Sequence, residues 1–209
     1  MTPARWDNSN TRNQPVAFID AVVREQRAAV AQHGLDPCTQ AQAAAHEAGH
    51  VIVGYAIGED ILGARLMREG GRWVGANRRD HASYSQGMVP VGSDPARALR
   101  SGINSMAGFS GEIVAGLAHP SSSIDERMLA REYAAAVADA SGGSEQAALD
   151  GFARLCIGAL MAHRQAFDTI RGHLCRTRRL TAAEALRMLR HVRRIELPTD
   201  PPRSLPLAA

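Results

Sequence analysis

The segment from Gln40 to Ile57 constrains the fold more than any other part of the chain. Thr39 before it is a typical helix N-cap residue and Gly58 after it is a typical helix stop, so these boundaries predict a helix of about five turns. The second half of this segment is apolar on nearly all sides. A helix of that kind is usually buried on every face, which predicts that it lies at the centre of the protein.

The same helix carries the pattern His46-Glu47-Ala48-Gly49-His50, which matches H-E-x-x-H. Residues four apart on a helix lie on one face, one turn apart, so the two imidazoles can point at a single metal ion. Glu47 flanks that face and can reach a water activated by zinc without being a ligand itself. The pattern predicts a zinc site formed by His46 and His50, with Glu47 as the general base. The alternative is a helix that carries two surface histidines and a glutamate by chance.

Gly49 gives a further expectation for this helix. Glycine inside a helix costs about 1 kcal/mol relative to alanine, so another element should approach closely at this turn.

A catalytic zinc site normally has three protein ligands, and the third is not in this helix. The extended metzincin pattern is excluded, because Val53 and Ala56 stand where it requires a glycine and a histidine. The nearby carboxylates are Glu112, Asp125 and Glu126. Spacing alone leaves Asp125 open between a zinc ligand and an acid favoured at a helix N-terminus.

Several other residues are candidates for supporting roles. Glu112 either orients a ligand from behind or is a solvated helix acid. His81, Tyr84 and His119 are loop candidates for stabilising an oxyanion, and the sequence does not choose among them.

Apolar periodicity along the chain predicts a mainly α fold with a small β-hairpin or sheet beside the zinc helix (α+β), of the zincin-like kind. One long helix should follow the break at 141–144, with an apolar stripe from Phe152 to Leu174, and a capping box at 181–184 should open a last helix. The other predicted elements are strands at 61–67 and 73–76, a turn at 69–71, and helices at 96–118 and 124–140. The domain organisation predicted is an N-terminal arm with one helix at 1–38, a metallopeptidase domain at 39–192 and a proline-rich tail at 193–209.

Composition excludes several functions. All 24 basic residues are arginine, so the chain has no lysine for a P-loop, a protein kinase or a Schiff base. Cys38, Cys156 and Cys175 are odd in number and match no CxxC pattern, which indicates a reducing compartment. No signal peptide or membrane-spanning stretch is recognisable, so we expect a cytoplasmic protein.

Two surface features remain open. Residues 171–194 carry eight arginines, which fits either a nucleic-acid partner or a solvated helix face. Without an aromatic platform or a known nucleic-acid motif, the solvated face is favoured. The predicted hairpin at 61–77 either offers an edge strand to an extended peptide or only covers the zinc helix.

The stretch AAAHEAGHVIVGYAIG at 43–58 resembles the zinc helix of the FtsH-type ATP-dependent metallopeptidases. Looser similarity to later segments of that family brings the coverage to about residues 39–189: MAGFSGEIVAG at 106–116, SSSIDERMLAREYA at 121–134 and ALMAHRQAFDTIRGHLCRTRRLTAAEALRML at 159–189. The resemblance implies that Asp125 is the third zinc ligand beside His46 and His50, with Glu47 as the base. The chain departs from the family at 109–112 and 121–125, where the neighbours of Glu112 and Asp125 differ.

We expect this protein to lack the family's ATPase module and membrane anchor. We therefore expect a zinc endopeptidase that cleaves unfolded or flexible polypeptides without ATP, with a homo-oligomer or a separate ATPase partner left open. One alternative is a catalytically silent zinc-binding or regulatory module of the same fold. A third reading is an arginine-rich nucleic-acid-binding protein in which the metal pattern is incidental.

Overall fold

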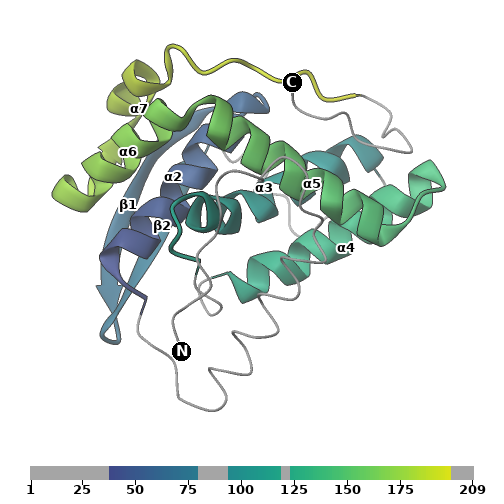
Figure 1. The fold of residues 1–209 in the computed structure, drawn as a ribbon, viewed down its shortest axis with the longest axis horizontal. Helices are drawn as coiled ribbons and strands as arrows, with labels where there is room; N and C mark the ends of the chain where they lie inside the picture. Colours follow the sequence, from purple (N-terminus) through teal and green to yellow (C-terminus); the bar gives the residue numbers. More distant parts are fainter. Residues whose placement is uncertain (1–37, 80–93, 119–122, 199–209) are drawn as a thin grey trace.

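The computed structural model describes residues 38–79, 94–118 and 123–198, which form six helices and three strands (Figure 1). The helices are α2 (Gln40–Ala56), α3 (Pro95–Val114), α4 (Ile124–Ser141), α5 (Glu145–Ala162), α6 (Arg164–Thr177) and α7 (Ala182–Leu189). The strands are β1 (Ile61–Glu69), β2 (Arg72–Arg79) and β3 (Arg179–Thr181). The expected mainly helical fold with a small sheet is confirmed. Apart from Cys38, the predicted N-terminal arm lies outside the described residues, as do residues 199–209 of the predicted tail.

Helix α2 is central, as predicted. It packs against the sheet on one side and against α3, α5 and α6 on the others (Figure 1). The Thr39 side chain accepts a hydrogen bond from the Gln42 backbone N–H, and the Gln42 side chain accepts one from the Thr39 N–H, which closes a capping box. The apolar run from Val51 to Val53 is fully buried. Apolar burial therefore anchors the metal-motif helix on all sides.

The sheet has the strand order β2-β1-β3 and is antiparallel throughout. The hairpin between β1 and β2 turns at Gly70 and Gly71, whose φ angles of 54° and 83° favour glycine. Strand β3 is absent from the predicted elements. It has only three residues and is formed by pairing with β1, which is far away in the sequence. Local hydrophobic periodicity therefore could not predict it.

The single long helix predicted after residue 144 is wrong, because the chain breaks at His163 between α5 and α6. His163 has φ −115° and ψ 33°, which lies outside the helical region. The apolar stripe continues across the break, with Phe152 and Leu174 both fully buried. Hydrophobic periodicity alone therefore could not reveal that the helix axis changes direction.

Helices α2 and α3 cross at very close range. A Cβ on Gly49 would collide with the backbone oxygen of Ala107, and a Cβ on Gly111 would collide with the backbone oxygen of Ala45. The close approach predicted at Gly49 is confirmed, and the partner is α3. This crossing brings the middle of α3 against the histidines of α2.

We expect Gly111→Ala to lower the free energy of unfolding by about 1–3 kcal/mol, since the new methyl group meets backbone atoms that cannot rotate away. Gly172→Ala on α6 is the matched control. Its Cβ would meet only the end of the Arg176 side chain at 3.3 Å, so the better helix propensity of alanine should raise stability by about 0.5–1 kcal/mol. Urea unfolding of both variants measures the difference. Equal stability of the two variants would contradict the tight crossing.

None of the helices in the three described ranges is both long enough and apolar enough to cross a membrane.

Candidate metal centre

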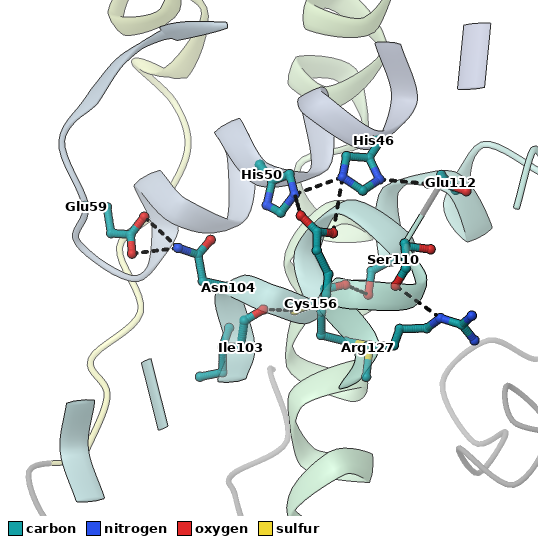
Figure 2. A network of polar contacts seen from close by, with 12 residues as sticks. His46, His50, Glu59, Ile103, Asn104, Ser110, Glu112, Arg127 and Cys156 are labelled. Carbon is teal, nitrogen blue, oxygen red and sulfur yellow. Dashed lines mark hydrogen bonds and ion pairs between the residues drawn. The ribbon is translucent and has the colours of Figure 1, made fainter. Parts of the chain in front are cut away.

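His46 and His50 lie one turn apart on α2 and present their rings to the same space. Their Nε2 atoms are 3.1 Å apart and the ring centroids 4.8 Å apart. Both residues are at least nine-tenths buried, with 9 % and 6 % of their surface exposed. Figure 2 shows the two imidazoles side by side above α3. The two histidines are therefore buried side chains and do not form a polar surface of α2.

Glu126 on the first turn of α4 completes a three-residue group. One carboxylate oxygen lies 3.2 Å from His46 Nε2 and the other 3.0 Å from His50 Nε2. The start of α4 is held against α3 by Arg127, whose guanidinium lies 4.9 Å from the centre of the Phe109 ring. The Arg127 Nε also donates a hydrogen bond to the Ser123 backbone oxygen at 3.3 Å. Helix packing, and not local sequence, brings this carboxylate to the histidines.

The geometry of the group fits a metal ion. Ligand atoms about 2.0–2.1 Å from a tetrahedral zinc are about 3.3 Å from one another. The two Nε2 atoms lie 3.1 Å apart, and each lies 3.0–3.2 Å from a different oxygen of Glu126. One donor atom from each of the three residues lies within 4.8 Å of the other two. Gly108 of α3 faces the same space, and a Cβ there would lie 2.6 Å from His50 Nε2 and would also collide with His46 Nε2. His46, His50 and Glu126 can therefore hold a metal ion in a space that a glycine keeps open.

Glu112 on α3 supports the group from behind. It has no exposed surface, and its Oε1 accepts a hydrogen bond of 2.7 Å from His46 Nδ1. A carboxylate on the far nitrogen of a ligating histidine fixes the ring and directs the other nitrogen at the metal. The buried contact excludes the reading of Glu112 as a solvated helix acid.

Glu47 lies on the flank of the histidine face, against strand β2. It has 3 % of its surface exposed, and a Cβ on Gly75 would overlap its carboxylate. The backbone of β2 at Gly75 therefore runs directly beside this side chain. Glu47 is not one of the three converging donors.

Asp125, the third ligand implied by the family resemblance, lies in the first turn of α4, but its side chain is outside the described part of the structure. Its ligand role stays a prediction. Glu126, the next residue, is the described acid that reaches both histidines. Glu126 was among the nearby carboxylates in the sequence. No local sequence signal shows which of two adjacent acids at a helix start is the metal ligand. The oxyanion candidates His81, Tyr84 and His119 also lie outside the described residues.

The buried charged groups of the site shift one another's pKa values. Burial favours neutral His46, but the carboxylates of Glu126 and Glu112 outweigh burial and raise the His46 pKa well above its usual value. Burial also favours neutral Glu126, but His50 and His46 hold the pKa of its carboxyl well below the usual range. Near neutral pH, the metal-free site therefore contains an imidazolium paired with a carboxylate.

These shifts predict how the stability of the chelator-treated protein depends on pH. Because the folded pKa of His46 is raised, its contribution is complete below the unfolded value of about 6.5 and is lost as the pH rises through the folded pKa. Because the folded pKa of Glu126 is lowered, its contribution is complete above about 4.3 and is lost as the pH falls. Urea unfolding from pH 4 to 9 should show a decline on the alkaline side. An identical alkaline decline in His46→Gln would assign it to another group.

Gly108→Ala should lower metal affinity at least about tenfold without removing any ligand, because the new methyl group displaces both Nε2 atoms. Titration with zinc against a competing chelator measures the change. Gly172→Ala is the control for a glycine-to-alanine change in a helix and should leave the affinity unaltered. Wild-type affinity in Gly108→Ala would show that the ion does not occupy this space.

No protein-family model matches this chain, and no curated protein is significantly similar to it.

Proposed function

We propose that this protein is a zinc-dependent endopeptidase. The observation that carries the proposal is the convergence of His46, His50 and Glu126 on one space, with Glu47 beside it on the same helix. Two histidines and one glutamate are a ligand set used by catalytic zinc sites, which keep a fourth position open for water or substrate. The resemblance of residues 43–58 to the zinc helix of FtsH-type peptidases supports the same reading and a zincin-like fold.

Each residue of the site has a defined task in this proposal. His46, His50 and Glu126 would hold the ion, which supplies Lewis acidity that polarises the scissile carbonyl and makes water acidic near neutral pH. Glu47 takes the proton of the attacking water and passes it to the leaving amine. Glu112 keeps the His46 ring in its ligating orientation.

Strand β2 supports a polypeptide substrate. It lies at the edge of the sheet, with β1 on one side and no further strand on its other side among the described residues. The strand runs beside Glu47 at Gly75, so an extended peptide paired with that edge would lie close to the base. We propose unfolded or flexible polypeptides as substrates, cleaved without ATP. All three cysteines are free thiols, which suits a cytoplasmic location.

One observation favours a second candidate, a catalytically silent zinc-binding module of the same fold. Glu47 is almost fully buried beside β2, and a base must reach water to act. In this candidate the ion stabilises the packing of α2 against α4 and no substrate is turned over.

Metal content and cleavage measured on the same preparation test the proposal. We expect one zinc ion per chain, cleavage of casein or of a quenched fluorescent peptide, loss of cleavage on treatment with a chelator and its return with added zinc. Stoichiometric zinc without cleavage of any unfolded substrate would favour the silent module. A chain that binds no zinc would overturn both candidates.

A further inference from the structure

Some arginines of the described residues form ion pairs with carboxylates and others do not. Arg131 on α4 pairs with Glu145, and both Arg164 and Arg171 on α6 pair with Asp168. A second group of exposed arginines forms no ion pair with any described residue; we call it the arginine face, and it consists of Arg65, Arg176, Arg178, Arg179, Arg187 and Arg190. Five of its six members belong to the arginine-rich segment 171–194, which the sequence alone assigned to a solvated helix face.

The tertiary structure adds Arg65 to this face from a distant part of the chain. Strands β1 and β3 pair so that Arg65 lies directly opposite Arg179, and both side chains are exposed. Like charges directly opposite on neighbouring strands destabilise a sheet. The pairing therefore concentrates positive charge at a cost in stability.

Arg178 at the end of α6 is a second costly position. Its φ of 59° makes it the one non-glycine residue with positive φ in the described ranges. A helix C-cap in this conformation normally has glycine or asparagine, because a larger side chain is strained there. Its guanidinium lies 5.2 Å from the centre of the Trp73 ring, at the edge of the sheet. Strained residues of this kind cluster at functional sites.

A groove of about 510 Å³ extends the face between the start of α6 and the end of α7. Its lining includes Arg187, Arg190, His163 and His191 and contains no carboxylate. Arg187 and Arg190 therefore give the groove a positive wall.

We propose that the arginine face and this groove bind the phosphate backbone of a nucleic acid. Arginine binds phosphate through two parallel hydrogen bonds and is always charged. The arginines of this face come from four parts of the fold, β1, the end of α6, β3 and α7, which suits a long and regularly charged partner. A concave basic groove follows a strand, whereas a flat lipid surface would not enter it. Binding is independent of base sequence and of the metal centre.

Fluorescence anisotropy with a labelled 20-nucleotide single-stranded DNA tests the proposal in the full-length protein. Two double variants remove parts of the face: Arg65→Gln with Arg179→Gln, and Arg187→Gln with Arg190→Gln. Each should weaken binding about tenfold at 50 mM salt and reduce the slope of log affinity against log salt by about 1.4, the value for two phosphate contacts on a single strand. Urea unfolding should show that the Arg65 and Arg179 variant is at least as stable as wild type, because it removes a like-charge pair. The Arg187 and Arg190 variant should unfold in the same cooperative transition as wild type, which shows that it is folded.

The matched control is Arg131→Gln with Arg154→Gln, which makes the same change in net charge on α4 and α5. It should change the affinity less than about twofold, because neither arginine belongs to the face. The proposal would be overturned if the wild type failed to bind DNA at 50 mM salt, or if the control lost as much affinity as the face variants. Equal affinity for poly-L-glutamate would also overturn it, by assigning the face to acidic polypeptides.

Discussion

Glu47→Gln should lower peptide cleavage by at least about 100-fold and leave one metal ion per chain. Glutamine has nearly the same shape as glutamate but cannot take a proton from water. Glu47 is not among the three converging donors, so the metal affinity should stay close to that of the wild type. The ratio kcat/KM for a quenched fluorescent peptide and the metal content of the same sample together measure both effects.

Glu132→Gln provides the matched control for this experiment. Glu132 is exposed on α4, so the same chemical change there should leave cleavage within about twofold of wild type. Equal activity of wild type and Glu47→Gln, with metal bound in both, would remove Glu47 from the role of base. Loss of the metal together with the activity would instead mean that Glu47 holds the site together.

Glu126→Gln should weaken metal binding by more than about 100-fold. Loss of a residue that only supports a ligand weakens metal binding by at most about 100-fold, so a larger loss indicates a ligand. The carboxylate contacts both histidines of the group, and an amide is a much weaker donor to a divalent cation. Asp125→Asn removes the same charge from the neighbouring residue and is the control. Zinc affinity by competition with a chelator should fall steeply for Glu126→Gln and by less than about tenfold for Asp125→Asn.

The opposite order of effects would establish Asp125 as the third ligand, as the family resemblance implies. Equal losses in the two variants would show that the site responds to negative charge at the start of α4 and not to a particular ligand. Either result would leave the proposed ligand roles of His46 and His50 unchanged and would change the account of how α4 completes the site.

The sequence by itself determined the parts of this protein whose signals are local. Thr39 as a helix N-cap and the apolar run of α2 defined the central helix, and the four-residue spacing of His46 and His50 put two imidazoles on one face. Gly70 and Gly71 predicted the turn of the hairpin, and the capping box at Thr181 predicted the start of α7. These features depend on residues within one or two turns of each other, and short-range geometry is what sequence patterns encode.

Only the tertiary structure decided which carboxylates surround the histidines. Glu126 is 76 positions away from His50 along the chain, and Glu112 is 66 away from His46. Glu112 arrives because α2 and α3 cross at Gly49 and Gly111, where no Cβ keeps the backbones apart. Glu126 arrives because α4 packs against α3. A metal site needs donor atoms to converge within about 3–4 Å, and over such separations in sequence that convergence is set by how helices pack.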